Sequence, residues 1–359
     1  MTPGEWYALG AAMTWASAVI LFQRTGERLP PVPLNLFKTA LSLVLLAGTL
    51  VLIGEPLLPE LSGRDLGLLI ASGVVGITLS DTLFLYGLRY LGASRSAVVE
   101  CLYSPFIILL SIACFGDQIA TTDGIGLVLV LAAVVTVARP ERGKSRTPRS
   151  GSGPSGQPLR LGIGVACGVG AMATLAIGVV LFDPVTENAS VFTVCTVRTA
   201  AAVATLWPLA LFTESRASFR ACFVPSSLWF WMVPASILGT YVALLFWIGG
   251  FAHAANSRAA ILNQSNTVFV IVLAAIFLRD PVTPRKLVAV ALGIGGVCVV
   301  LLGRPDPAPS REARLDAVPM APGAVSSTPV YSALRCPAGV KGRLDDSTGL
   351  SVDRRRALR

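Results

Sequence analysis

The chain has 359 residues, of which 53% are hydrophobic and only 14% are charged. A soluble globular domain is usually about 45–50% apolar and about 25% charged, so this composition excludes an ordinary soluble domain and indicates a membrane protein. The net charge of +9 does not indicate nucleic-acid binding, because the basic residues fall in loops and in the tail rather than on a folded basic face.

Ten apolar stretches follow one another along the chain. Each is long enough to cross a bilayer, whose core of about 30 Å needs roughly 20 apolar residues per helix. In lipid only a helix satisfies its backbone hydrogen bonds within one segment, so the predicted fold is an all-α integral membrane protein with ten transmembrane helices. The predicted helices are 5–23, 32–53, 66–88, 93–115, 119–138, 159–182, 190–212, 226–250, 256–278 and 284–303.

The first stretch, 5–23, is expected to remain in the protein as a membrane helix. It has no basic region before it, carries Glu5 and offers no convincing cleavage site, so it does not look like a cleavable signal peptide. A transit peptide is not expected either.

The cysteines predict neither a metal site nor a disulfide framework. There are seven, they are scattered without a C-x-x-C pair, and His253 is the single histidine. We therefore expect no metal and no cofactor, and we expect the cysteines inside apolar stretches to act as small hydrophobic residues.

The first five stretches resemble the last five in sequence. GAAMTWASAVILF, which begins at Gly10, matches GAMATLAIGVVLF, which begins 160 residues later at Gly170, and at the same offset Lys38 matches Arg198. Farther along the offset is 163, so that Asp117 matches Asp280. An odd number of spans per repeat gives the two copies opposite orientations, as in secondary transporters with a substrate site near the midplane.

Two segments lack the apolar pattern and divide the chain into four parts. Residues 139–158, RPERGKSRTPRSGSGPSGQP, predict a flexible basic linker. Residues 304–359 are rich in Pro, Arg, Asp and Ser and predict a disordered C-terminal tail. The remaining parts, 5–138 and 159–303, are each predicted to be a repeat of five transmembrane helices.

Polar residues inside the predicted helices are the candidates for a substrate cavity. Glu100 and Tyr103 are spaced to share one face of the fourth helix, and the repeat offset maps them onto Asn263 and Asn266 in the ninth. Charged groups at membrane depth are costly, so Glu100 calls for a functional reason. Two such faces at matched depth predict the lining of one central cavity; hydrogen bonding between helices is the alternative.

Five further residues complete the set of candidates. Trp15, Asp81 and Gln264 are predicted to line the cavity, and Asp81 either takes part in proton coupling or forms an ion pair with Arg89. Lys38 and Arg198, early in the second and seventh helices, are interpreted as structural groups that snorkel or pair with acids. An anionic-substrate role for these two cations is the alternative.

These features resemble an EamA-type transporter of the drug/metabolite transporter superfamily. Trp15 lies in a stretch similar to the family's Trp-containing opening, and Lys38 and Arg198 occupy positions where the family usually has arginine. Each fourth helix of a repeat ends in an acidic turn, FGDQIATTDGIG and LRDPVTPRKLVA, although the family more often has Glu where this chain has Asp117 and Asp280.

The resemblance implies a multi-pass protein of the plasma (inner) membrane that exports or imports a small metabolite. Substrates in the family include amino acids, metabolites and sugar derivatives. Family members normally have both termini in the cytoplasm. The excess of Lys and Arg in the loops after the odd-numbered helices instead puts both termini outside, so the orientation stays open.

The predicted function is secondary-active transport of a small metabolite by alternating access, and export is one of the two directions in which the transporter could work. Its partners would be a small-molecule substrate, membrane lipids and, if Glu100 exchanges a proton, protons; no nucleic acid is expected, and the oligomeric state is open. The absence of a G-x-x-x-x-G-K-[ST] motif excludes an ATP-driven pump on this chain. An intramembrane enzyme, for which no catalytic residues are found, and a membrane scaffold without transport activity are the alternatives.

Overall fold

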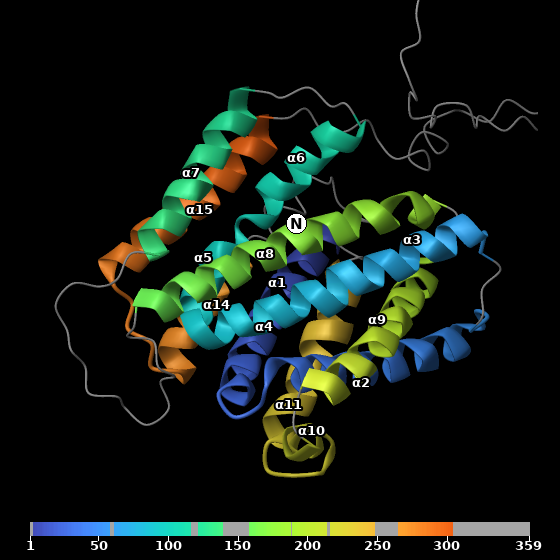
Figure 1. Ribbon diagram of the computed structural model, residues 1–359. Coiled ribbons are helices and arrows are strands. Elements are labelled where there is room, and N and C mark those ends of the chain that lie inside the picture. The colour runs from blue at the N-terminus through green and yellow to red at the C-terminus, as the bar shows by residue number, and fades with distance from the viewer. Residues whose placement is uncertain are drawn as a thin grey trace, which may run out of the picture. The chain divides into compact units, whose positions relative to one another are not determined.

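Helices make up every regular element in the part of the chain that the computed structural model describes (Figure 1). The described ranges are 3–57, 61–115, 121–138, 158–187, 189–213, 216–247 and 265–303. They belong to one unit, Met1–Pro309, whereas the second unit, Ser310–Arg359, lies outside the described residues. The predicted linker up to residue 157 and the predicted disordered tail from residue 304 also fall outside these ranges.

The first half begins with two long helices joined by a short turn. Pro31 lies in the first turn of the second helix, where its missing N–H costs nothing, and Gly54 closes that helix with a φ of 78°. Ser62 caps the third helix by accepting a hydrogen bond from the backbone N–H of Asp65 at 3.1 Å. The elements are α1 (Pro3–Gly26), α2 (Pro31–Ile53), α3 (Gly63–Gly73), η1 (Val74–Leu79), α4 (Ser80–Leu91), α5 (Ala93–Glu100), α6 (Tyr103–Phe115) and α7 (Thr121–Ala138).

The described elements of the second half follow the same order with two additions, the 3-10 helix η2 and the short helix α10, neither of which hydropathy predicted. Its elements are α8 (Pro158–Phe182), η2 (Asp183–Glu187), α9 (Val191–Thr213), α10 (Arg216–Phe223), α11 (Trp229–Ser236), η3 (Ile237–Val242), α14 (Asn266–Phe277) and α15 (Pro284–Gly303). The helix that contains η3 continues through residues 243–247.

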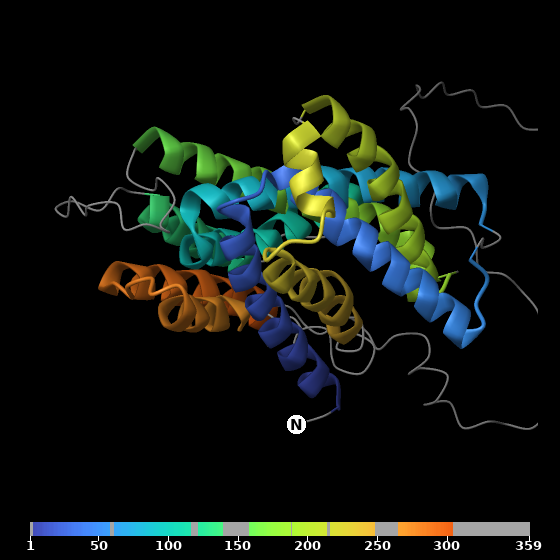
Figure 2. The same cartoon turned by 90° about the horizontal axis from the view of Figure 1, so that it is seen from below.

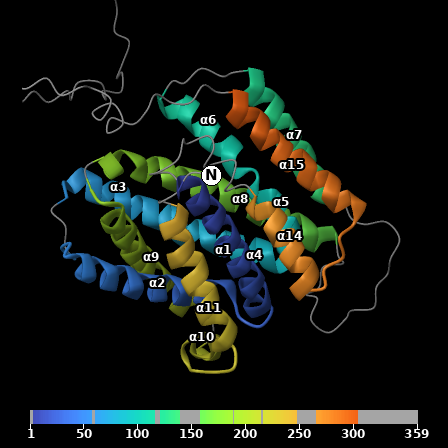
Figure 3. The same cartoon turned by 180° about the vertical axis from the view of Figure 1, so that it is seen from behind.

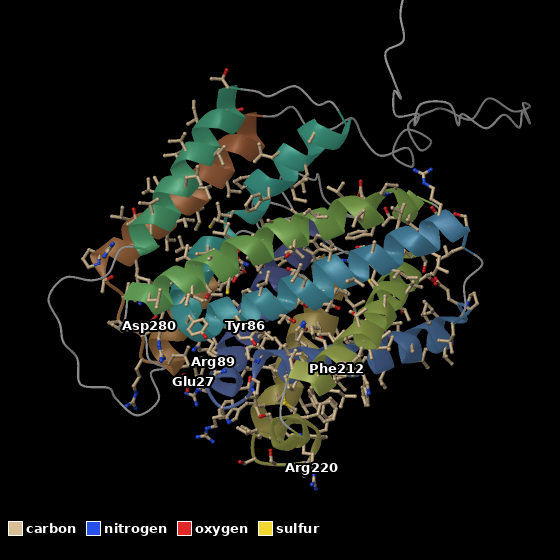
Figure 4. All side chains as sticks on the ribbon, in the orientation of Figure 1. Glu27, Tyr86, Arg89, Phe212, Arg220 and Asp280 are labelled. Carbon is tan, nitrogen blue, oxygen red and sulfur yellow. The ribbon has the colours of Figure 1, made fainter. Side chains whose placement is uncertain are left out.

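Five of the described helices are long and apolar enough to cross a membrane, and the protein is a multi-pass membrane protein. They are Pro31–Ile53, Gly63–Leu91, Leu159–Thr186, Val191–Thr213 and Trp229–Trp247, and two shorter apolar helices cover Gly124–Thr136 and Asn266–Phe277. Large apolar side chains on their outer surfaces, such as Phe212 on α9 (Figure 4), are exposed because they face lipid rather than water.

The predicted single helix over 93–115 is wrong. The chain turns at residues 101 and 102, where the N–H groups of Cys101 and Leu102 bond to carbonyls only three residues back, at 3.2 and 3.0 Å. Pro105 explains the break, because it has no N–H to donate to Cys101, and it is tolerated in the first turn of a new helix. Glu100 therefore ends α5, and Tyr103 begins α6.

Corresponding elements of the two halves pack against each other. α9 begins 160 residues after α2, and the two are in extensive contact; α15 begins 163 residues after α7, and these two lie side by side in Figures 1 and 3. α1 also lies between α14 and α11, which belong to the other half (Figure 2).

The π-helical segments η1 and η3 also occupy equivalent positions, 163 residues apart. Both contain a glycine at the same place, and both glycines allow close packing against the other half. A Cβ on Gly76 would lie 3.1 Å from Cα of Gly178, and one on Gly239 would lie 2.9 Å from Cβ of Ala18. Isolated π-helical turns are frequently found at functional sites, and these two border the cavity described next.

Candidate functional site

A cavity of about 300 Å³ lies between the two halves. The first half contributes side chains from α1, α2, η1, α4, α5 and α6, and the second contributes α8, α9, η3, residues 243–247 and α14. Helices of both repeats therefore build one shared space.

All candidates from the sequence that the structure describes line this cavity. They are Trp15, Lys38, Asp81, Glu100, Tyr103, Arg198 and Asn266. Asn263 and Gln264 lie outside the described residues. The structure brings these candidates together, and their roles remain predictions.

Glu100 is held by donors from both halves. Oε2 accepts a hydrogen bond from Nε1 of Trp15 at 3.0 Å and a longer one from Nδ2 of Asn266 at 3.4 Å. Oε1 is buried and has no hydrogen-bond partner within the described part of the chain. The Trp15 ring lies 5.7 Å from that of Phe84, which fixes the indole N–H toward the carboxylate. Glu100 and Tyr103 both reach the cavity, although not from one continuous helix as predicted.

Lys38 and Asp81 both line the cavity and neutralise each other as an ion pair. The Nζ–Oδ2 distance is 2.5 Å, and the side chains are only 5% and 24% exposed. Pairing of Lys38 with an acid is what the sequence suggested, whereas the partner of Asp81 is this lysine rather than Arg89. Arg89 lies in the last turn of α4 (Figure 4).

Arg198 has a different environment. The residue is 8% exposed, and its guanidinium carbon lies 4.1 Å from the centre of the Phe182 ring. It forms no ion pair with a described residue, and its buried Nε has no hydrogen-bond partner among them. The pairing of Arg198 with an acid that the sequence suggested is therefore not found in the described residues.

The rest of the lining is mostly apolar, with several hydroxyl groups. Sequence reasoning missed these hydroxyls and the two glycines at the π-helical segments, which are Thr39, Ser42, Ser80, Thr199, Thr240, Gly76 and Gly239. A signal existed for two of them, because Thr39 and Thr199 follow Lys38 and Arg198 at the same repeat offset. A few polar groups in apolar walls are typical of small-molecule sites.

The described residues contain no group of three or more His, Cys, Asp or Glu side chains that could hold a metal ion. Among the cysteines whose side chains the structure describes, Cys101, Cys167, Cys195, Cys222 and Cys298 form no disulfide.

Apolar helices that surround a cavity with polar groups fit a membrane transporter. The chain belongs to the EamA-like transporter family, whose sequence pattern matches residues 2–139 and 162–302, so the resemblance seen in the sequence is confirmed.

Two further comparisons agree with this assignment. The chain is 22% identical over 313 residues to the uncharacterized transporter YetK of Bacillus subtilis (strain 168), covering 86% of this chain and 91% of YetK. A crystal structure of a protein that is 15% identical superposes with a TM-score of 0.60, covering 83% of this chain and 96% of the other, which shows likeness of fold alone.

Proposed function

We propose that this protein is a secondary-active transporter of a small metabolite in the plasma (inner) membrane, built from ten transmembrane helices in two inverted repeats. The observation that carries the proposal is the cavity between the halves. Its volume of about 300 Å³ is at the lower end of the range of small-molecule sites, which suits a metabolite rather than a large drug. Export and import are both compatible with it.

The contacts between equivalent helices support alternating access. α2 meets α9 and α7 meets α15, so the two repeats touch along elements that are related to each other. If one repeat rocks against the other at these contacts, two equivalent packing arrangements are exchanged. The cavity then opens first to one side of the membrane and then to the other.

Glu100 is the residue that we propose for proton coupling. Its Oε1 has no hydrogen-bond partner among the described residues, so the carboxylate has an oxygen available for a proton or for a cationic group of the solute. The other charged or titratable groups that line the cavity are Lys38, Asp81, Tyr103, Cys195 and Arg198. Competition between proton and solute for one carboxylate would couple their movements without ATP.

Reconstitution into liposomes tests the proposal. We expect purified protein to exchange radiolabelled metabolites from a mixed panel across the bilayer without ATP, and to respond to an imposed proton gradient. Leu175→Trp would fill part of the cavity from α8 and should block flux. Val51→Trp is the matched control, because Val51 is exposed on α2 and does not line the cavity.

Monodisperse wild-type protein that moves no member of the panel would contradict transport and favour a scaffold. Conversion of a panel member without movement would favour an intramembrane enzyme. Equal flux through Leu175→Trp and wild type would contradict the role of the cavity.

A further inference from the structure

We propose that Arg198 binds an anionic group of the transported solute, so that the substrate class is a carboxylate with an apolar body. This inference rests on the proposed function, because it assigns a ligand to the same cavity. It takes up the alternative that the sequence left open for this arginine and differs from the structural role that the sequence favoured.

The first step is the unbalanced charge of Arg198. The charged residues among the described lining are Lys38, Asp81, Glu100 and Arg198. Lys38 and Asp81 cancel each other at 2.5 Å. Arg198 is buried without an ion pair to a described residue, and a buried cation of this kind is costly unless something neutralises it.

The second step is the comparison between repeats. Lys38 and Arg198 are equivalent, 160 residues apart, but their counter-ions are not. The position 163 residues after Asp81 is Leu244, and Leu244 also lines the cavity. The second repeat therefore keeps the cation and lacks the acid that neutralises it in the first. A solute anion supplies the missing charge.

The third step is the geometry of the guanidinium. Its carbon lies 4.1 Å from the centre of the Phe182 ring, and its Nε lacks a hydrogen-bond partner among the described residues. Nε and one Nη form the edge that binds the two oxygens of a carboxylate through parallel hydrogen bonds. This edge fits a planar carboxylate better than a point charge.

The fourth step is what surrounds the guanidinium. Leu175, Val179 and Phe182 are spaced at intervals of four and three residues along α8, so they form one apolar face of the cavity. A solute whose carboxylate reaches Arg198 can place a hydrocarbon or aromatic body against this face.

Charge balance links the anion to Glu100. With Lys38 and Asp81 neutral as a pair, Arg198 and Glu100 are the two charged lining residues without an ion pair to a described residue. A bound carboxylate adds one negative charge, and a proton on Glu100 removes one. Entry of the anion is therefore favoured together with a proton, so for an anionic solute Glu100 would take up a proton with the solute rather than exchange one for the other.

The test uses purified full-length protein in detergent and measures ligand affinity from thermal stabilisation. The probes are benzoate, phenylacetate and hexanoate at pH 7, each beside its neutral amide. We expect at least one carboxylate to bind more tightly than its amide. In Arg198→Gln its affinity should fall tenfold or more. Arg198→Lys should retain part of the preference, because it keeps the charge and loses the planar edge.

Two matched variants strengthen the test. Arg220→Gln removes an exposed arginine of α10 outside the cavity (Figure 4) and should leave the preference unchanged. Leu244→Asp restores an acid at the position equivalent to Asp81 and should weaken carboxylate binding more than Leu244→Asn does.

The inference is overturned if no carboxylate binds better than its amide, or if the preference survives in Arg198→Gln or in Leu244→Asp. Should Arg198→Gln aggregate, Leu244→Asp compared with Leu244→Asn gives the same decision. Flux in liposomes without an Arg198-dependent carboxylate preference would overturn this inference and leave transport standing. Carboxylate binding without any flux would overturn transport and leave the anion site.

Discussion

The indole N–H of Trp15 on α1 donates a 3.0 Å hydrogen bond to the carboxylate of Glu100 at the end of α5. Asn266 on α14 reaches the same oxygen from the second half of the chain. One carboxylate thus joins both halves at the cavity, and movement of the halves would change its hydrogen bonds.

Glu100→Gln should remove the pH dependence of flux in proteoliposomes and leave expression and melting close to wild type. The glutamine amide keeps an oxygen that accepts the Trp15 N–H, but it cannot exchange a proton. Flux measured between pH 5.5 and 8.5 under a fixed solute gradient checks this. The control is Glu55→Gln, because Glu55 accepts hydrogen bonds from Ser190 and Thr193 and does not line the cavity.

Unaltered pH-dependent flux in Glu100→Gln would exclude the coupling role. A lower melting temperature without a change in the pH profile would instead indicate that Glu100 is a structural contact between helices.

Trp15→Phe should reduce flux several-fold and lower stability by roughly 1–2 kcal/mol, because a hydrogen bond to a charged group is lost while the ring contact with Phe84 is kept. Unfolding in mixed micelles gives the stability, and liposome flux gives the activity. Trp6→Phe, at an exposed tryptophan of the same helix, is the matched control. Equal losses in both variants would contradict a specific role for the Trp15 N–H.

Lys38→Met and Asp81→Leu should each destabilise the protein by roughly 1–3 kcal/mol, because each leaves a buried or half-buried charge without its partner. The double variant should be more stable than either single one, since it removes both charges together. A double-mutant cycle of unfolding free energies measures the coupling. Strictly additive losses would show that the 2.5 Å contact contributes no coupling.

Both chain ends are expected on one side of the membrane, because ten spans return the chain to the side where it began. Reporter fusions at Met1, at Arg359 and within 139–157 check this, and the fusion within 139–157 should report the opposite side. The count of Lys and Arg residues in the loops places both ends outside the cell, whereas family members normally have both ends in the cytoplasm. We expect the cytoplasmic arrangement. Ends on opposite sides would mean that the number of spans is wrong.

The positions of long helices could be predicted from the sequence because lipid exposure makes them apolar along their whole length. The predicted segment 32–53 differs from α2 by one residue at its start, and the predicted segment 190–212 differs from α9 by one residue at each end. The turn after Glu100 was missed although Pro105 marked it. Hydropathy is the same on both sides of such a break, so it does not show where the backbone hydrogen bonds stop.

Candidate site residues could be found from their depth within the predicted membrane helices and from the offset between the two sequence repeats. Together these two criteria singled out Glu100 and Asn266. The unbalanced charge of Arg198 could not be found from its own neighbourhood in the sequence. It depends on Leu244, 46 residues farther along the chain, and on the pairing of Lys38 with Asp81 in the other repeat. The π-helical segments η1 and η3 were missed because their hydrogen-bond register leaves no mark in hydrophobicity.

Gly178→Ala should destabilise the protein by roughly 1–3 kcal/mol, because α8 and η1 touch through their backbones at this point. A Cβ on Gly178 would lie 2.6 Å from Cα and 3.0 Å from N of Gly76, and backbone atoms cannot yield as a side chain does. The nearby hydroxyl of Ser72 donates a hydrogen bond to the Gly178 carbonyl at 2.5 Å, so separation of the two helices also strains a buried hydrogen bond.

Gly48→Ala is the matched control for that substitution. Gly48 is an exposed helical glycine of α2, and a Cβ there would meet nothing within 4 Å. We expect Gly48→Ala to be neutral or slightly stabilising, because alanine favours the helix over glycine. Unfolding in mixed micelles should therefore show a lower stability for Gly178→Ala than for wild type, and no loss of stability for Gly48→Ala. Equal stability of Gly178→Ala and Gly48→Ala would contradict the close contact between η1 and α8, and with it the position of η1 in the cavity wall.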